Sequence, residues 1–311
     1  MRLDVIGLGE VCIDWVAFVE RFPEPDEKIY SLRMEKFPGG VIANFCVGAA
    51  RLGLRVGFMG GVGRDPEGEF LLKNFRDNNV DYSHTKIIED RGSAVNMLVV
   101  NREGQKTAVI DPNLYNNALD PHELDEEYIA SSRCIHTSAI KPKTAEEAFR
   151  IAGRRGVVTS VDLEKQVVET DPETVKRILE MANILIPNKM GARRFTGKDD
   201  LVEAGKTLLG YGPEVVVITV GEDGAIVITR ESVERVPAYR VRAVDATGAG
   251  DAFAAGFIYG YVVRGWDPYK SARMGNAVAA IKCLSPGAQT GLPTIEQVRE
   301  FLRERGEDLG I

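Results

Sequence analysis

The hydrophobic residues of this chain form short continuous runs, several of them ending in glycine, and these runs alternate with stretches whose apolar residues recur at helical spacing. Continuous runs are typical of buried strands, and helical spacing is typical of amphipathic helices. We expect strands at residues 3–11, 55–63, 93–101, 106–111, 133–140, 157–163, 183–188, 214–221, 224–230 and 239–245. We expect helices at residues 41–53, 67–80, 145–156, 172–182, 200–212, 251–265, 268–284 and 294–306.

From residue 40 onward the expected strands mostly alternate with helices. This order predicts an α/β fold, a doubly wound and mainly parallel sheet with helices on both faces. Two extended and more polar stretches, about residues 12–37 and 91–111, interrupt the alternation. We interpret them as a small β-sheet lid, with long loops as the alternative. No linker divides the chain, so we expect a single domain over residues 1–311.

Composition and charge narrow the function classes. The 311 residues carry a net charge of −7, which argues against a surface that follows nucleic acid. The N-terminal sequence MRLDVIGLGEV lacks the apolar core of a signal peptide, and no apolar run is long enough to span a bilayer. We therefore expect a cytoplasmic protein without a membrane partner. The cysteines and histidines show no zinc-binding spacing.

The stretch AVDATGAGDAFAAGF, residues 243–257, reads as a turn from a strand into a helix. Helix N-termini present unpaired N–H groups, and small residues let an anion approach them. Gly248, Ala249 and Gly250 are therefore candidates for an anion hole. Asp251 follows in the first helical turn, either as a helix cap or as a general base beside that hole. The second interpretation suits phosphoryl transfer to an alcohol, and the stretch lacks the lysine of a Walker A loop.

A second constellation lies in FPGGVIANFCVGAARLG, residues 37–53. Gly39 and Gly40 permit a close backbone approach, and Asn44 opens a helix of small residues. An amide that both donates and accepts suits vicinal hydroxyls, and Asp14 would add an acceptor carboxylate. Together these residues predict a polyol site. Helix capping for Asn44 and a solvated loop position for Asp14 are the alternatives.

These two stretches resemble, in order and separation, the signature regions of the ribokinase-like (PfkB) carbohydrate kinase family. The resemblance extends to GEVCIDW, GGVGRDPEG, ILIPNKMGARRFTG, VVVITVGEDGAIV and SPGAQTGLPT, and so covers almost the whole chain. It implies a doubly wound α/β fold with a β-lid. It also implies transfer of the γ-phosphoryl group of ATP, with Mg²⁺, to a hydroxyl of a sugar, a sugar derivative or a nucleoside.

The resemblance also implies roles for individual residues. Asp251 matches the catalytic base, and Gly248, Ala249 and Gly250 match the anion hole. Asp14, Gly40 and Asn44 match contacts to substrate hydroxyls. The nucleotide site would include Asn188, Thr219, Gly221, Gly224 and Asn276. Many members bind a monovalent cation, such as K⁺, near the anion hole, and Asp245 and Thr247 match the source of its ligands.

The chain departs from the family pattern in four places: Gly191, Val41, the strand CIHTSAIKP, which lacks a glutamate that ribokinases place near the sugar, and the run VDLEKQVVE, which differs from the DPNxR-like run of many relatives. Gly191 stands where an N-x-x-E motif usually has its glutamate, so either magnesium is not handled through this position or another carboxylate replaces the glutamate. Val41 stands where ribokinases proper often carry a lysine. Ribose is therefore not supported as the substrate.

The sequence is compatible with several substrates and assemblies. A nucleoside base would stack on lid aromatics, for which Trp15, Phe18 and Phe37 are candidates. A sugar acid would pair with a lid cation, for which the candidates are Arg33, Arg91 and Lys106. A non-catalytic sugar- or nucleotide-binding relative is a third possibility, although the retained Asp251 argues against it. Free lid edges predict a homodimer formed through the lid.

Overall fold

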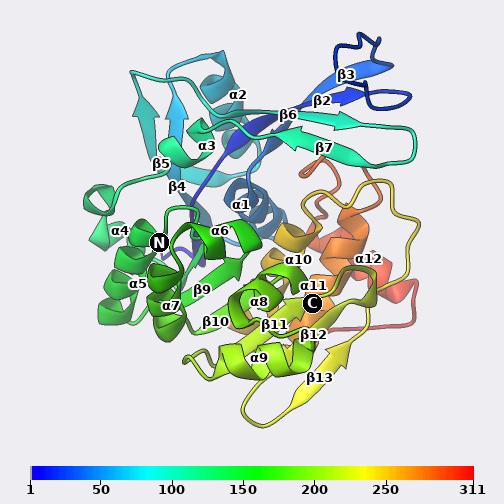
Figure 1. Cartoon of the computed structure of the whole chain (residues 1–311). Coiled ribbons are helices and arrows are strands. Elements are labelled where there is room, and N and C mark those ends of the chain that lie inside the picture. The colour runs from blue at the N-terminus through cyan, green and yellow to red at the C-terminus, as the bar shows by residue number, and fades with distance from the viewer. Residues whose placement is uncertain (1) are drawn as a thin grey trace.

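The computed structural model describes residues 2–311, and its largest element is a sheet of nine strands (Figure 1). The strands are β1 (Val5–Leu8), β4 (Val56–Gly63), β5 (Val80–Ile88), β8 (Cys134–Thr137), β9 (Val158–Leu163), β10 (Ile184–Pro187), β11 (Val215–Thr219), β12 (Ala225–Ile228) and β13 (Val233–Val236). They lie in the order β13-β12-β11-β10-β9-β8-β1-β4-β5. Neighbours pair in parallel from β5 to β11, whereas β12 pairs antiparallel with β11 and β13. The mainly parallel sheet expected from the sequence is confirmed.

Helices cover both faces of this sheet. One face carries α1 (Val41–Arg51), α2 (Pro66–Asp77), α10 (Ala249–Ile258), α11 (Pro268–Lys282) and α12 (Ile295–Arg303). The other carries α4 (Glu126–Ala130), α5 (Pro142–Arg155), α6 (Lys165–Thr170), α7 (Pro172–Met181), α8 (Lys189–Thr196) and α9 (Leu201–Leu209). Successive strand residues point to opposite faces, so Val5 and Ile6 of β1 belong to different hydrophobic layers. The burial of both faces explains why the strands read as continuous apolar runs.

Shorter elements complete the main body. They are a one-turn helix α3 (Asn113–Asn116), single 3₁₀ turns at Pro121–Glu123 and Gly221–Asp223, and a π-helical turn at Tyr259–Val263 that continues α10. Within residues 2–311 no helix is both long and apolar enough to cross a membrane.

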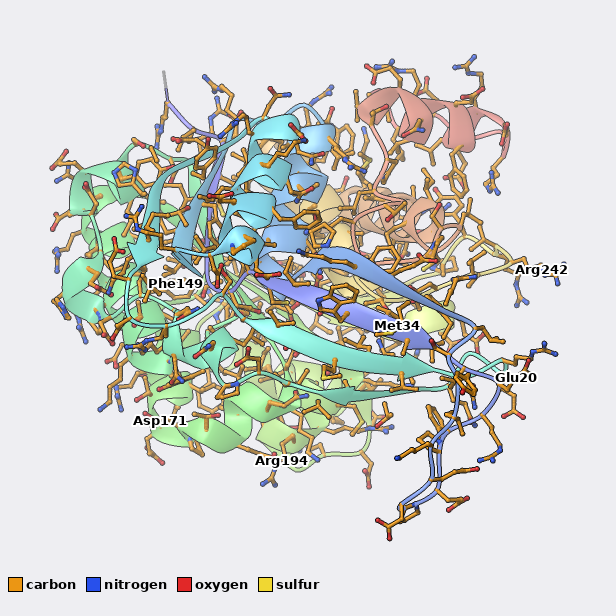
Figure 2. All side chains as sticks on the ribbon, turned by 90° about the horizontal axis from the view of Figure 1, so that it is seen from above. Glu20, Met34, Phe149, Asp171, Arg194 and Arg242 are labelled. Carbon is orange, nitrogen blue, oxygen red and sulfur yellow. The ribbon has the colours of Figure 1, made fainter. Side chains whose placement is uncertain are left out.

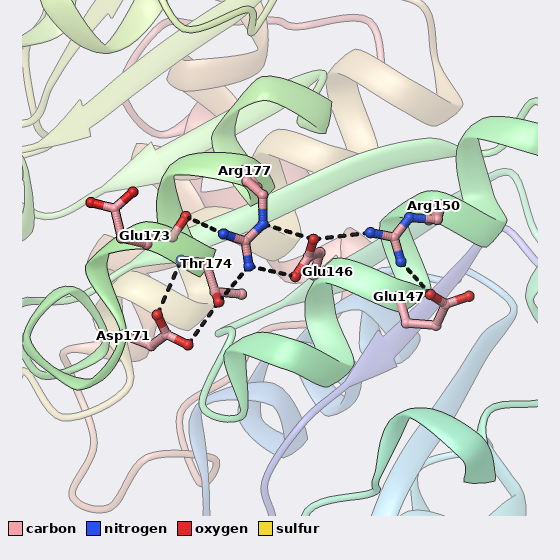
Figure 3. A network of polar contacts seen from close by, with 7 residues as sticks. All are labelled: Glu146, Glu147, Arg150, Asp171, Glu173, Thr174 and Arg177. Atoms are coloured by element: carbon pink, nitrogen blue, oxygen red, sulfur yellow. Dashed lines mark hydrogen bonds and ion pairs between the residues drawn. The ribbon is translucent and has the colours of Figure 1, made fainter.

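Neighbouring helices α5 and α7 are linked on the surface by a charged network (Figure 3). Arg177 of α7 donates to both carboxylate oxygens of Glu146 on α5, at 2.9 and 3.0 Å. Arg150 donates to the same Glu146 at 2.9 Å. Because the arginine side chains are about half exposed, solvent screens these pairs and the network mainly orients the two helices.

A separate sheet of four strands forms the expected lid. Its strands are β2 (Cys12–Phe18), β3 (Arg33–Gly39), β6 (Val95–Val100) and β7 (Lys106–Val109), in the order β3-β2-β6-β7. Figures 1 and 2 show this sheet extending away from the main body, with Met34 on it and Glu20 near its far end. The small sheet, rather than a pair of long loops, is thus the observed arrangement.

Two expectations from the sequence are wrong in detail. Residues 239–245 form no strand, and β13 at Val233–Val236 takes the edge of the sheet instead. After β13 the chain is held by α11: Asn276 donates to the carbonyls of Val236 and Pro237, and the Val244 N–H donates to the Cys283 carbonyl at 2.7 Å. These bonds anchor the two ends of the segment to α11, and most of the residues between them are exposed, so water can satisfy the remaining backbone groups.

The second difference concerns the helix expected at residues 67–80. It ends at Asp77, and the chain turns at Asn79, whose φ is 56°. Val80 then begins β5, a strand that the pattern did not predict. The short helices α6 and α8, which lie close to the carboxyl ends of β9 and β10, were also not predicted.

Candidate active site

A cavity of about 870 Å³ lies between the lid and the main body. The inner face of the lid, the ends of β9, β10 and β11, and the loop before α10 all line it. Of the residues proposed from the sequence, those lining it are Asp14, Gly40, Asn44, Asn188, Thr219, Gly221, Thr247, Gly248, Ala249, Gly250 and Asp251. Those that do not line it are Gly39, Gly224, Asp245 and Asn276. The carboxyl ends of parallel strands are the usual place for ligands in such a sheet.

The N-terminus of α10 opens into this cavity. Gly248 precedes the helix with φ of 80°, a left-handed conformation that side chains disfavour. The Ala249 N–H donates to the Ala246 carbonyl at 3.1 Å. The N–H groups of Gly248 and Gly250 have no acceptor within residues 2–311. Two free donors at a helix N-terminus can therefore face an anion in the cavity.

The Asp251 carboxyl is held by a side chain rather than by the helix backbone. Its Oδ2 accepts a hydrogen bond from Asn44 Nδ2 at 2.7 Å, and no side chain caps α10. Asn44 Oδ1 accepts in turn from Gln289 Nε2 at 2.9 Å, and Gln289 Oε1 accepts from Asn74 at 2.7 Å. This chain of amides fixes both side chains, so neither Asp251 nor Asn44 serves as a helix cap.

The electrostatic environment favours a protonated Asp251 at acidic pH. Burial raises the pKa of Asp251 to about 7, and the charges of Glu164 and Glu10 act in the same direction. The hydrogen bond from Asn44 and the charge of Lys282 partly oppose this shift. A carboxyl whose pKa is near neutrality can accept a proton and release it at physiological pH.

Three further carboxyls in the cavity were not proposed from the sequence. Glu10 follows β1, accepts from Ser138 Oγ at 2.7 Å, and has its pKa raised to about 7 by burial. Asp162 lies near the end of β9 and Glu164 just after it, and both line the cavity. An acidic residue at the end of a buried strand is the signal that would have identified all three.

On the lid side, Asp14 lies on the inner face of β2. Its Oδ1 accepts from Asn96 Nδ2 at 3.1 Å, and Asn96 is directly opposite on β6. The other carboxylate oxygen of Asp14, Oδ2, has room because residue 39 is a glycine. A Cβ at this position would stand 2.3 Å from Asp14 Oδ2. Gly39 therefore leaves space for the Asp14 carboxylate without lining the cavity itself. Asn96 is a hydrogen-bond partner of Asp14 that the sequence did not reveal.

The far end of the cavity is built around β11. Thr219 ends this strand and Gly221 begins the following turn, and both line the cavity. Gly224 packs instead against the Val236 carbonyl, which would lie 2.1 Å from an added Cβ. Asn276 donates to the same carbonyl at 3.0 Å. These two residues support the wall of the cavity from outside it.

Asp245 and Thr247, the candidate ligands of a monovalent cation, bond to each other. Asp245 Oδ1 accepts from the Thr247 N–H at 2.9 Å and from its hydroxyl at 2.7 Å, and Oδ2 accepts from the Gly287 N–H at 2.8 Å. The ammonium of Lys282 donates to the Asp245 carbonyl at 2.7 Å. A fixed positive charge therefore lies beside this loop.

The lid residues proposed to recognise the substrate fall into two groups, those that line the cavity and those that do not. Lys106 of β7 lines the cavity and donates to the Thr247 hydroxyl at 3.2 Å, whereas Arg33 and Arg91 do not line it. The three lid aromatics proposed to stack on a base also lie outside the lining; they are Trp15, Phe18 and Phe37. Tyr115 is the only aromatic residue among the described residues that line the cavity.

Known proteins resemble this chain along nearly its full length. A 5-dehydro-2-deoxygluconokinase from Geobacillus kaustophilus is 30% identical over 322 residues, which cover 97% of this chain and 94% of that protein. An ATP-dependent ribose-1-phosphate kinase from Halopiger xanaduensis is 31% identical over 301 residues, covering 97% of this chain and 98% of that protein.

Solved structures share the fold. Ribokinase from Thermotoga maritima superposes with a TM-score of 0.86 at 24% identity, covering 97% of this chain and 99% of that one. A ribokinase II from E. coli in complex with ATP and Mg²⁺ gives a TM-score of 0.85 at 21% identity, with the same coverage. The family model described as pfkB family carbohydrate kinase matches residues 2–295. The chain therefore belongs to the PfkB family of carbohydrate kinases, which are phosphotransferases with an alcohol group as acceptor.

Proposed function

We propose that this protein transfers the γ-phosphoryl group of ATP, with Mg²⁺, to a hydroxyl of a small sugar derivative, and that Asp251 is the general base. One observation carries the proposal. The buried Asp251 carboxyl has one oxygen held by Asn44, and it lies in the first turn of a helix whose free N–H groups face the same cavity. A proton acceptor beside an anion hole is what phosphoryl transfer to an alcohol needs.

The reaction follows from this arrangement. Asp251 accepts the proton of the substrate hydroxyl as its oxygen forms a bond to the γ-phosphorus and the bond to the β-phosphate oxygen breaks. The products are a sugar phosphate and ADP. The backbone of Gly248, Ala249 and Gly250 forms the anion hole, in which the free N–H groups of Gly248 and Gly250 stabilise the charge on the moving phosphoryl group.

The two ends of the cavity suit the two substrates. Asp14, Gly40 and Asn44 would contact sugar hydroxyls on the lid side, with Gly39 holding Asp14 in place. The nucleotide would lie along Asn188, Thr219 and Gly221, with Gly224 and Asn276 supporting that wall from behind.

Two observations support a negatively charged sugar derivative as the acceptor rather than a nucleoside. The two relatives named above are kinases of a gluconate derivative and of ribose 1-phosphate, both of which carry an anionic group. Lys106 brings an ammonium from the lid into the cavity, and among the lining residues only Tyr115 could stack on a base. We therefore propose a sugar acid or sugar phosphate as the acceptor.

The proposal is tested by incubating the protein with ATP and Mg²⁺ and pools of sugar acids, sugar phosphates, neutral sugars and nucleosides, and measuring ADP release. We expect release with a pool of sugar acids or sugar phosphates. Release with nucleosides alone would favour the nucleoside kinase alternative. Nucleotide binding without release in any pool would favour a non-catalytic relative.

The role of Asp251 is tested by Asp251→Asn, which keeps the shape of the side chain but cannot accept the proton. We expect turnover to fall by about 10²–10⁴-fold with little change in nucleotide binding. The matched control is Asp199→Asn, because Asp199 is exposed and lies outside the cavity lining. Near-normal turnover in Asp251→Asn would exclude this residue as the base.

The pH dependence provides a second readout. Because the pKa of Asp251 is raised to about 7, its ionised, proton-accepting form is lost below this pH. We expect kcat/KM to fall about tenfold per pH unit below pH 7 and to level off above it. Glu10 has a similarly raised pKa, so Glu10→Gln serves as the control. That variant should keep the acid limb, moved to lower pH because a neighbouring negative charge has been removed.

A further inference from the structure

Four carboxyls line the cavity beside the proposed anion hole, and two of them have no side-chain partner. Glu10 accepts a hydrogen bond from Ser138, and Asp251 accepts one from Asn44. Asp162 is 8% exposed and lines the cavity, yet its carboxyl accepts no hydrogen bond from any side chain in residues 2–311. Glu164 precedes α6 without capping it and is equally without a side-chain partner in this part of the chain.

A buried carboxylate without a donor or a counter-charge is costly, so such groups are normally paired or coordinate a metal. No lysine or arginine within residues 2–311 forms an ion pair with Asp162 or Glu164. The charges of Glu164, Asp251 and Glu10 all act against an ionised Asp162. Glu164 has one attractive charge near it, the ammonium of Lys106, which forms no ion pair with it. A bound triphosphate would add further negative charge. This arrangement is therefore favourable only with a cation between the carboxylates and the phosphates.

The backbone around Gly191 fixes the turn that carries both carboxyls. A Cβ at Gly191 would lie only 2.0 Å from the Leu163 carbonyl oxygen, so α8 packs directly against the residue between Asp162 and Glu164. Asn188 Oδ1 accepts from the Gly191 N–H at 2.8 Å and holds the start of α8 in this position. The glutamate that the family pattern has at position 191 therefore does not fit here. The carboxyls near this point belong instead to Asp162, near the end of β9, and to Glu164, just after it.

We propose that Asp162 and Glu164 bind, directly or through water, the Mg²⁺ that accompanies ATP, in place of the glutamate missing at position 191. The inference rests on the proposed function. Mg²⁺ is usually held by one or two carboxylates, with substrate phosphates and waters completing its shell. Within residues 2–311 no group of three or more His, Cys, Asp or Glu residues is arranged to hold a metal ion, so the proposed site depends on the phosphates for its remaining ligands. When bound, the ion neutralises part of the triphosphate charge.

The test measures nucleotide binding rather than activity. The affinity of the wild type for the non-hydrolysable analogue adenylyl imidodiphosphate is determined by calorimetry in EDTA and again in excess Mg²⁺. The variants are Asp162→Asn and Glu164→Gln, which keep the size of each side chain. Glu169→Gln is the matched control, because Glu169 lies on α6, the helix that directly follows Glu164, but pairs with Arg194 on the surface. Thermal unfolding of each variant checks that it is folded.

We expect Mg²⁺ to tighten binding of the analogue to the wild type and to the control. In Asp162→Asn and Glu164→Gln this tightening should shrink by about tenfold or more. In EDTA the two variants should bind at least as tightly as the wild type, because a repulsive charge has been removed. That opposite response separates a metal ligand from a residue that merely supports the fold.

An unchanged effect of Mg²⁺ in both variants overturns the inference, as does a wild type whose affinity for the analogue is independent of Mg²⁺. In either case the proposed function is not overturned, because the analogue still binds and phosphoryl transfer is measured separately by ADP release. Absence of analogue binding to the wild type, with or without Mg²⁺, overturns both. A variant that binds the analogue more weakly in EDTA than the wild type also contradicts the inference, because removal of the carboxylate should reduce repulsion.

Discussion

Lys282 is a fully buried lysine directly behind the proposed anion hole. Its side chain has no exposed surface, and its ammonium donates to the Asp245 carbonyl at 2.7 Å. Burial lowers the pKa of Lys282, while the negative charges of Asp245 and Asp251 act in the opposite direction. The same charge favours the ionised form of Asp251. Lys282 therefore supplies a fixed positive charge beside the loop for which the sequence suggested a monovalent cation.

We accordingly expect phosphoryl transfer by the wild type to be nearly independent of K⁺. The rate should change by less than about twofold when K⁺ is replaced by Na⁺ or tetramethylammonium. Lys282→Met removes the charge at similar volume, and it should lower activity in all three salts. In that variant K⁺ should restore part of the activity, because the loop then lacks its internal cation. Strong activation of the wild type by K⁺ would contradict this role for Lys282.

Much of the proposed site follows from local sequence. Gly248, Gly250 and Asp251 are adjacent in one turn, so their chemistry is visible in a short stretch. The contact between Asn44 and Asp251 is different, because it joins residues far apart in the chain and depends on how α1 packs against α10. The sequence predicted a role in the site for Asn44 and for Asp251. It did not predict the hydrogen bond between them, which excludes helix capping for both. Gln289, which orients Asn44, carries no local signal of this role.

At the level of elements, apolar runs between glycines predicted most strands because both faces of the sheet are buried. The alternating pattern at residues 239–245 also looks like a strand, yet no neighbouring strand is available there beyond the edge strand β13. Whether such a segment pairs depends on the whole sheet, which a local pattern does not contain. The carboxyls of Asp162 and Glu164, at the end of β9, were not predicted for a related reason. Their proposed role depends on their position relative to α8 and α10, which a local pattern does not contain.

The contact between α8 and the end of β9 yields an element-level prediction. In Gly191→Ala the added Cβ would lie 2.0 Å from the Leu163 carbonyl oxygen, so either the helix or the strand end must move. We expect this variant to lower the free energy of unfolding by about 1–3 kcal/mol, as overpacking usually does. Urea denaturation, with the midpoint and the m-value compared with wild type, measures the change.

Gly153 provides the matched control. It lies inside α5, and nothing stands within 4 Å of a Cβ added there. Gly153→Ala should raise the free energy of unfolding by about 0.5–1 kcal/mol, because alanine favours helix without a clash. The same substitution is thus expected to act with opposite sign in two helices. A stabilising Gly191→Ala would show that α8 does not press on the turn that carries Asp162 and Glu164.

At the scale of the whole molecule, the lid has two different faces. Residues that line the cavity alternate along its strands with residues that point away from it, as in any strand. On the outer face Trp15, Met97 and Val109 lie opposite one another across β2, β6 and β7. They are 36%, 59% and 72% exposed, and Met34 on β3 is 55% exposed. An apolar row on a sheet with two free edges favours association with another surface.

We therefore expect the lid to pair with the lid of a second copy, giving a homodimer. Light scattering after size exclusion should report twice the chain mass of 34.1 kDa. Met97→Lys, which places a charge in the middle of the apolar row, should shift the mass toward that of one chain. Because Met97 points away from the cavity, any loss of activity in this variant would come from the lid's need for a partner rather than from a lost contact to substrate.

The control for this prediction is Val233→Lys, which introduces the same charge on β13, the edge strand of the large sheet, where Val233 is 41% exposed. If the interface is the lid, this variant stays dimeric. If Val233→Lys dissociates the dimer and Met97→Lys does not, the large sheet supplies the interface instead. A wild type that is monomeric at micromolar concentration would mean that the outer lid face is covered by something other than a second copy, or that it remains exposed to solvent.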